Sequence, residues 1–303
     1  MRLKSAFCVF LFFSGISAYS QSTEGVRNIN GTRLFVKEAG KGEVLIVIHG
    51  GPGLNHSYFL PHLDPLAKKL KVVYYDQRAC GQSAIPSVDS LSLSYFIDDI
   101  EAIRKMTGAN KVNLLAHSWG TLLAVQYGIT YPDRVNKMIV SNPVPLNPEY
   151  QKISGALLQS KTTKQDSLDR AELIASPAFK NQDVAATEAL LKVIFRPSFY
   201  DREKVASLDL NLPFNYGKAT TALYGGLGKD MQSYDYYDAI RTFTFPVLVV
   251  AGRADNIPME AIERIQHNIL GSKLIVFEKS GHFPFIEEQE KFTTEVISFL
   301  KNK

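Results

Sequence analysis

The fold is decided by the stretch Lys111-Val112-Asn113-Leu114-Leu115-Ala116-His117-Ser118-Trp119-Gly120-Thr121-Leu122-Leu123-Ala124. Its apolar first half, residues 112–116, predicts a buried strand, and the run that begins at Trp119 predicts a helix. Ser118 stands at the junction. Small residues two positions before and after a Ser permit the sharp strand-to-helix turn called a nucleophile elbow. Ala116 and Gly120 fill those positions here, so we predict that Ser118 is a nucleophile.

Strands and helices alternate on both sides of this stretch. A hairpin is predicted over residues 26–38, with its turn at Asn30-Gly31. Apolar runs predict further strands at 44–48, 72–75, 112–116, 137–141, 246–252 and 273–277. Apolar periodicity predicts helices at 58–70, 94–107, 119–131, 259–270 and 287–301. Such alternation predicts an α/β fold with a mostly parallel sheet covered on both faces.

The N-terminus has the features of a secretory signal peptide. Arg2 and Lys4 precede an apolar run at residues 6–13, and small residues at Ala18 and Ser20 predict cleavage before Gln21. An uncleaved anchor is the alternative, but the run is too short to span a bilayer. We therefore expect a periplasmic or secreted protein, with no membrane association beyond export.

Composition is that of a globular protein, with 45% hydrophobic and 21% charged residues among 303. Removal of residues 1–20 leaves 32 basic against 30 acidic residues, a net charge of +2, because Arg2 and Lys4 lie in that segment. No cluster of Lys and Arg is present, so we expect no nucleic-acid partner.

After removal of residues 1–20, Cys80 is the only cysteine left, which excludes an intramolecular disulfide. We expect its side chain to pack in the protein interior.

The regular alternation stops between residues 143 and 244. This segment shows short helical patterns and many aromatic residues, which we expect to form mostly a small core of its own. It is predicted to be a helical cap inserted into the sheet domain. The expected division is a signal peptide at 1–20, the first part of the core at 21–142, the cap at 143–244 and the second part of the core at 245–303.

Four features lie where predicted strands end, and in such sheets ligands bind beyond the carboxyl ends of the strands. They are the glycine-rich loop at 49–53, Ser118, Asp255 and His282. A Ser hydroxyl needs a base to take its proton, and His282 is the candidate base. Asp255 would hold the imidazole in the correct tautomer. Alone, Asp255 can be a turn residue or helix cap and His282 a core histidine, but their joint order in the chain favours a catalytic triad.

Acyl transfer also needs backbone N–H donors that face the developing oxyanion. We expect one from Trp119, the residue after the nucleophile, and one from Gly51. A tight turn without catalytic role is the alternative for the glycine loop. A phosphate-binding loop is not indicated, because no Lys-Ser/Thr pair follows the glycines. We give His49 and His117 structural roles, with His49 bonding to backbone.

Together these motifs resemble those of the prolyl iminopeptidase family of α/β-hydrolases. The resemblance covers about residues 26–142 and 245–300 and rests on His49-Gly50-Gly51-Pro52-Gly53, Asp76-Gln77-Arg78-x-x-Gly81-x-Ser83, His117-Ser118-Trp119-Gly120, Gly252-Arg253-Ala254-Asp255 and Ser280-Gly281-His282. It implies the α/β-hydrolase fold and a serine peptidase that releases an N-terminal residue, often proline, from short peptides. It implies no metal and no cofactor, and it leaves the oligomeric state open.

The chain departs from the family at two places. Ala116 stands where the family usually has Gly. The family binds the free amino terminus of its substrate with glutamates of the cap, yet this chain has no Glu from Lys204 to Met259. The acidic candidates for an amine site are Glu203, Asp235 and Asp238; the alternative is that the aspartates lie on a solvated helix face.

The leading hypothesis is therefore an aminopeptidase of the prolyl iminopeptidase type, acting on short peptides. A carboxylesterase or lactonase acting on small acyl substrates is the alternative, because the same triad and oxyanion donors serve either acyl group. A ligand-binding relative without catalysis is disfavoured, since binding alone does not require all four parts.

Overall fold

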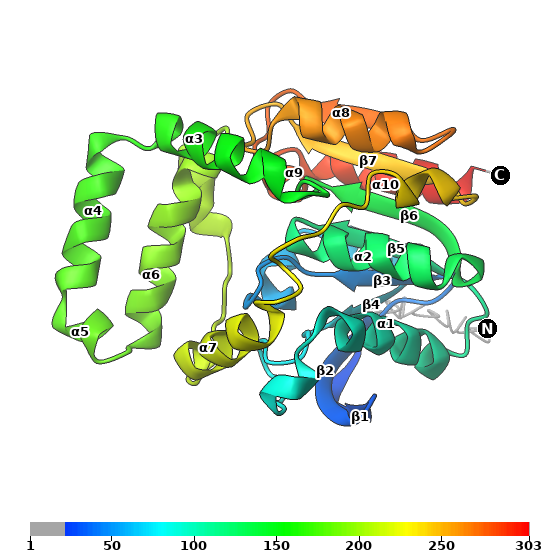
Figure 1. The fold of residues 1–303 in the computed structure, drawn as a ribbon, viewed down its shortest axis with the longest axis horizontal. Helices are drawn as coiled ribbons and strands as arrows, with labels where there is room; N and C mark the ends of the chain where they lie inside the picture. The colour runs from blue at the N-terminus through cyan, green and yellow to red at the C-terminus, as the bar shows by residue number, and fades with distance from the viewer. Residues whose placement is uncertain (1–21, 303) are drawn as a thin grey trace, which may run out of the picture.

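The computed structural model describes residues 22–302 and contains one eight-stranded sheet (Figure 1). The strand order is β1-β2-β4-β3-β5-β6-β7-β8, with β2 antiparallel to both neighbours and the remaining pairs parallel. The strands are β1 Thr23–Ile29, β2 Thr32–Ala39, β3 Val44–Ile48, β4 Lys71–Tyr75, β5 Val112–His117, β6 Val135–Ser141, β7 Val247–Gly252 and β8 Lys273–Phe277. This confirms the predicted α/β class. The predicted signal peptide lies outside the described residues.

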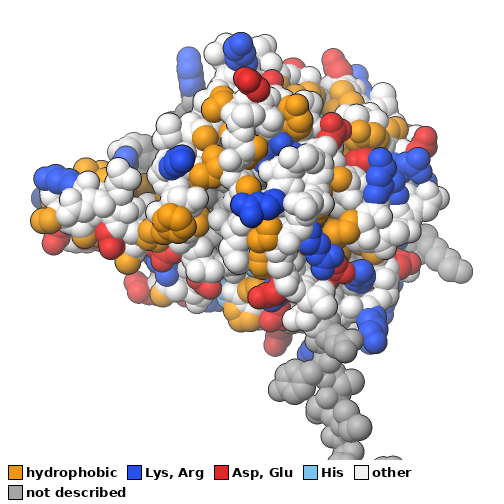
Figure 2. Space-filling model, turned by 90° about the horizontal axis from the view of Figure 1, so that it is seen from below, with side chains coloured by type: hydrophobic (Ala, Val, Ile, Leu, Met, Phe, Trp, Pro, Cys, Tyr) orange, Lys and Arg blue, Asp and Glu red, His pale blue; other side chains and the backbone are white. Residues whose placement is uncertain are grey.

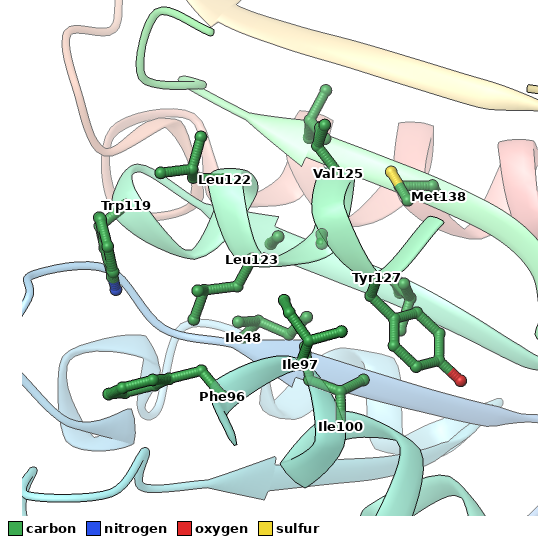
Figure 3. Close-up of a cluster of buried hydrophobic side chains, with 14 of the residues drawn as sticks. Ile48, Phe96, Ile97, Ile100, Trp119, Leu122, Leu123, Val125, Tyr127 and Met138 are labelled. Atoms are coloured by element: carbon green, nitrogen blue, oxygen red, sulfur yellow. The ribbon is translucent and has the colours of Figure 1, made fainter. Parts of the chain in front are cut away.

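Two hydrophobic layers cover the two faces of the sheet. Side chains alternate along each strand, so Ile46 and Ile48 of β3 face one layer while Leu45 and Val47 face the other. The first layer contains α1 (Leu93–Thr107), α2 (Trp119–Thr130) and α8 (Met259–Asn268). In Figure 3, Leu123 of α2 lies near Ile48, next to side chains of α1. The second layer contains α10 (Gln289–Lys301), which follows the short helix α9 (Pro284–Glu287).

The first hairpin has the predicted two-residue turn. Ile29 pairs with Thr32, and the residues between them, Asn30 and Gly31, have φ values of 46° and 74°. Positive φ at both central positions is the geometry of a type I′ turn, which Asn-Gly favours. Local turn chemistry was sufficient for this prediction.

The predicted helix over residues 58–70 is wrong. The segment forms two short 3₁₀ helices instead, His56–Phe59 and Asp64–Lys68. Pro61 lies between them; it has no N–H to continue a helix, and it disfavours helical backbone at the residue before it. The apolar pattern still marks the buried side, since Phe59, Leu63 and Leu66 pack into the second layer.

Between β6 and β7 the described chain contains helices and turns but no strand. The helices are α3 Gln151–Lys161, α4 Lys164–Ala175, α5 Pro177–Lys180, α6 Val184–Phe195 and α7 Tyr216–Leu227. Helices α4, α5 and α6 project together from the body as an arm (Figure 1). Buried Asp166 stabilises the arm where it joins the body, because Arg196 and Arg202 both donate to the Asp166 carboxylate. The boundaries of the predicted cap, 143 and 244, stay predictions.

The aromatic residues of this segment do not form a core of their own. Tyr234 and Tyr237 belong to the first layer of the sheet and Phe199 to the second. Phe214 is 91% exposed and Tyr224 is 59% exposed. The expectation of a separate small core was therefore wrong: the long arm buries little, and aromatic side chains near the sheet are buried against it.

The face seen from below shows basic and acidic side chains interspersed among hydrophobic ones rather than gathered by sign (Figure 2). Within residues 22–302, no helix combines the length and the apolar character that crossing a bilayer requires.

Candidate active site

The elbow places Ser118 in an unusual backbone conformation between β5 and α2. Its φ and ψ are 53° and −126°, values that residues with a side chain rarely adopt. Its N–H donates to the carbonyl of Ser141 at 3.1 Å. Position 120 has room only for glycine, because a Cβ there would lie 2.5 Å from the carbonyl oxygen of Ile48. Ala116 pairs regularly within β5, so the Ala at this position does not disturb the turn.

Asp255 and His282 are in direct contact beyond the ends of β7 and β8. The Nδ1 atom of His282 lies 2.9 Å from Oδ2 and 3.1 Å from Oδ1 of Asp255. Both residues are buried, and Oδ1 also accepts the N–H of Asn256 at 2.7 Å. A carboxylate only accepts hydrogen bonds, so Nδ1 carries the proton and Nε2 is left as a base.

Asn142 joins this pair and was not predicted. Its carboxamide donates to Oδ2 of Asp255 at 2.7 Å and to the carbonyl of Gly281 at 3.0 Å. Asn142 is fully buried and has φ of 48°, directly after β6. The strand-end argument that selected Asp255 applies equally to the residue after the predicted strand 137–141, and that signal was available in the sequence.

The glycine loop is connected to the base through two buried side chains. The N–H of Gly50 donates to the hydroxyl of Tyr58 at 2.5 Å, and that hydroxyl lies 2.9 Å from Nδ1 of His117. Nε2 of His117 lies 2.7 Å from the carbonyl of His282. Because that carbonyl can only accept, Nε2 of His117 carries the proton, Nδ1 accepts, and the Tyr58 hydroxyl donates to it.

These hydrogen bonds limit which backbone N–H groups are available to bind an oxyanion. The N–H of Gly50 is engaged by Tyr58, which leaves Gly51 as the candidate donor from this loop. Trp119 is the first residue of α2, where backbone N–H groups have no partner within the helix. Gly50 also has to be small, since a Cβ there would lie 3.0 Å from the Cβ of Ser118.

The two other histidines at the strand ends, His49 and His117, are buried and have hydrogen-bond partners at both ring nitrogens. Burial lowers the pKa of His117 well below its usual value, so this ring is neutral. Burial also lowers the pKa of His49 to about 4. The His49 ring contacts backbone on both sides: Nε2 accepts the N–H of Gln77 at 3.0 Å, and Nδ1 donates to the carbonyl of Gly50 at 2.8 Å.

The motif at residues 76–78 supports the same loops. Oδ1 of Asp76 lies 2.7 Å from Nδ1 of His56. Gln77 donates to the carbonyl of His49 at 2.7 Å and accepts the indole N–H of Trp119 at 3.2 Å. Arg78 is buried against Asp99. The motif therefore fixes Trp119 and the glycine loop rather than contributing a reactive group.

A cavity of about 400 Å³ lies beside the elbow. Both candidate oxyanion residues form part of its wall, and most of the remainder comes from the segment between β6 and β7. Its lining residues are Gly51, Pro52, Trp119, Val144, Gln151, Tyr224, Leu227, Gly228, Met231 and Tyr234. Within residues 22–302 no group of three or more His, Cys, Asp or Glu side chains is placed to hold a metal ion.

Comparison with known proteins identifies the fold and the family. The family model described as alpha/beta hydrolase fold matches residues 43–289. The proline iminopeptidase of Heyndrickxia coagulans is 32% identical over 92% of this chain and 99% of its own. That of Saccharolobus solfataricus is 28% identical over 95% of this chain and 96% of its own. An alpha/beta fold family hydrolase from Bacillus anthracis superimposes with a TM-score of 0.71 at 22% identity, over 92% and 99% of the two chains.

The chain is a prolyl iminopeptidase-like α/β-hydrolase.

In this prolyl iminopeptidase-like hydrolase, the three acids predicted to bind a substrate amine do not form part of the cavity wall. The Asp238 side chain is 93% exposed and 3.4 Å from Arg241. Asp235 is exposed and accepts the N–H of Tyr237 at 3.0 Å. Glu203 is exposed on the 3₁₀ helix Arg202–Ser207. None of the three is among the residues that line the cavity.

Two further charged side chains attach the cap segment of the hydrolase to the loops of the acid and the base. Lys161, the last residue of α3, donates to the backbone carbonyls of Ala254 and Asp255 at 2.5 and 2.6 Å. Glu287 accepts the N–H of Gly281 at 2.6 Å and that of Tyr200 at 2.9 Å. Burial raises the pKa of Glu287 and lowers that of Lys161. Neither residue carried a sequence signal, because Lys161 and Glu287 each join segments that are more than 80 residues apart in the chain.

Proposed function

We propose that this chain is a serine hydrolase with a catalytic triad of Ser118, His282 and Asp255. The observation that carries the proposal is the buried His282–Asp255 pair at the edge of the sheet where the elbow presents Ser118. Nε2 of His282 takes the proton of the Ser118 hydroxyl as Oγ attacks the substrate carbonyl. The N–H groups of Gly51 and Trp119 stabilise the resulting oxyanion.

The leaving group then departs with the proton that His282 holds, and an acyl-enzyme remains on Ser118. Water attacks this ester with His282 again acting as base, which releases the acid and restores the serine. Asp255 keeps the imidazole oriented throughout and stabilises its charged form. This sequence of steps serves amide and ester substrates alike.

Short peptides are the first proposed substrates, cleaved after the N-terminal residue. Support comes from relatives named proline iminopeptidase, which are 28–32% identical over more than nine-tenths of this chain. The motifs around Gly51, Ser118 and His282 support the same class.

A carboxylesterase or lactonase is the second candidate. One observation favours it: none of the ten residues that line the cavity carries a charge, whereas a site for a free amino terminus needs a partner for the ammonium. The triad and the oxyanion donors are equally suited to an ester.

A parallel rate comparison separates the two candidates. The purified protein is assayed on proline arylamide, alanine arylamide and short-chain aryl esters. Cleavage of proline arylamide supports the peptidase. Strong ester turnover with no arylamide cleavage would establish the esterase instead, and the absence of all three activities together with no fluorophosphonate labelling would refute the serine hydrolase itself.

A further inference from the structure

The lining of the cavity beside the elbow identifies the chemical class of group that it binds. Gly51 and Trp119 lie on its wall, so a carbonyl held by their N–H groups places one of its substituents in the cavity. This step rests on the proposed acyl-transfer function. The rest of the lining is mainly aliphatic and aromatic and includes Val144, Leu227, Met231 and two tyrosines.

The acids nearest in sequence to the lining residues have other partners. Asp230, next to Met231, accepts the N–H of Leu93 at 2.7 Å. Glu149, close to Gln151, is 72% exposed and lies 3.8 Å from Arg264. Asp235, next to Tyr234, accepts the N–H of Tyr237. An ammonium in this cavity would therefore lose its water without gaining a carboxylate among the lining residues, which is costly.

The polar groups in the lining are neutral. The Tyr234 hydroxyl donates to the carbonyl of Pro145 at 3.3 Å and lies 3.4 Å from the amide nitrogen of Gln151. A carboxamide such as that of Gln151 offers two N–H donors and a carbonyl acceptor and carries no net charge. It is suited to an ester, a lactone or an acylated amine rather than to an ammonium ion.

We infer that this cavity binds an uncharged, apolar acyl group, which favours the second proposed function over the first: the enzyme prefers neutral acyl compounds to substrates with a free amine beside the scissile carbonyl. Esters, lactones and N-acylated amino acid derivatives belong to the favoured class.

Two substrates that differ at one atom test the inference. They are the 4-nitrophenyl esters of proline and of cyclopentanecarboxylic acid, which have the same ring except that a methylene replaces the amine. At about pH 6 the amine is charged. We expect kcat/KM for the cyclopentane ester to exceed that for the proline ester at least about tenfold, after subtraction of spontaneous hydrolysis. Equal values, or a preference for proline, would overturn the inference.

Fluorophosphonate labelling of the same samples separates this result from failure of the proposed function. No labelling and no turnover of either ester would refute the serine hydrolase itself. Labelling without turnover of the cyclopentane ester would leave the triad in place and overturn only the inference about the cavity.

A negative charge placed in the cavity should shift the preference towards the proline ester. Gln151→Glu adds a carboxylate to the wall, and we expect it to raise kcat/KM for the proline ester at least about tenfold relative to the cyclopentane ester. Gln151→Met controls for loss of the carboxamide. Gln159→Glu is the matched charge control, because Gln159 lies on the same helix but lines a different cavity. A proline preference unchanged by Gln151→Glu, or changed equally by Gln159→Glu, would contradict the inference.

The three acids predicted from the sequence provide the opposing test. If Glu203, Asp235 and Asp238 hold a substrate amine, their combined change to amides lowers kcat/KM for the proline ester and leaves the cyclopentane ester unaffected. The inference expects no change in the ratio of the two rates. A tenfold fall for the proline ester alone would place the amine site at these acids and refute the neutral cavity.

Discussion

The side-chain nitrogen of Asn142 lies 2.7 Å from Oδ2 of Asp255, and the same amide donates to the carbonyl of Gly281, the residue before His282. One carboxamide thus joins the loop of the acid to the loop of the base. The Ser141 hydroxyl, 3.2 Å away, donates to its oxygen, so the orientation of the amide is fixed. Because both its acceptors are buried, Asn142 positions the pair rather than merely filling space.

Asn142→Leu keeps the size of the side chain but removes both donors. We expect kcat to fall at least about tenfold with KM little changed, because Asp255 and the base loop lose their common support. Thermal unfolding should show a loss of stability of about 1–3 kcal/mol for buried acceptors left without donors, and a further loss from the strain of Leu at a φ of 48°. Steady-state kinetics with a short-chain aryl ester measures the split, and an unchanged kcat would show that the amide does not position the pair.

Ser118→Ala removes the proposed nucleophile from a turn whose conformation depends on its neighbours. We expect labelling by a fluorophosphonate to disappear and the rate to fall by several orders of magnitude, while the fold is retained. Mass spectrometry of the labelled protein and circular dichroism are the two measurements. A labelled Ser118→Ala protein would show that another residue attacks.

Tyr58→Phe removes the hydroxyl between Gly50 and His117. The N–H of Gly50 then has no acceptor, and Nδ1 of His117 has no donor. We expect a fall in kcat, since the glycine loop is released from the elbow, and a loss of stability of about 1–3 kcal/mol. Tyr75→Phe is the matched control, because the buried Tyr75 hydroxyl makes no hydrogen bond. Equal effects of the two variants would argue against a role for the connection to His117.

The sheet and its hairpin could be predicted because their signals are local. A two-residue type I′ turn requires positive φ at both positions, and Asn30-Gly31 adopts such values readily. The apolar runs are long enough to predict strands. The segment at 58–70 could not be predicted from apolar periodicity alone, since Pro61 divides it while its side chains remain buried.

The candidate acid and base could be selected from the sequence because each lies a few residues beyond a predicted strand. Their supports could not. Lys161 bonds to backbone carbonyls 93 and 94 residues away, and Glu287 accepts the N–H of Tyr200, 87 residues away; no spacing rule reports such contacts. The exposed positions of Asp235 and Asp238 likewise follow from how the segment packs, which composition does not reveal.

Export is predicted from the N-terminal residues alone. We expect the mature protein to begin at Gln21 when the full chain is expressed in a bacterium with a general secretion pathway. N-terminal sequencing of the protein recovered from the periplasm or medium measures this. Replacing Ala18 with a bulky residue such as Leu should block cleavage. Accumulation of an uncleaved, soluble cytoplasmic protein from the unaltered chain would contradict the prediction.

Acidification should destabilise the fold through its buried histidines. Burial lowers the pKa of His49 to about 4 from 6.5. The unfolded chain therefore binds a proton more readily, and stability present above about pH 6.5 is lost as the pH falls towards 4. For His49 this amounts to roughly 3 kcal/mol. His117 acts in the same direction.

Urea unfolding between about pH 4 and pH 7 measures this loss, and His49→Asn isolates one contributor. The variant is less stable at neutral pH because Gln77 loses its acceptor, so the slope of stability against pH is the informative quantity. We expect the unfolding free energy of the variant to change less steeply with pH than that of the unaltered protein, because one of the buried histidines no longer contributes to the slope. His267→Asn, at an exposed position on α8, is the matched control. A slope that His49→Asn leaves unchanged would show that this ring does not resist protonation in the folded state.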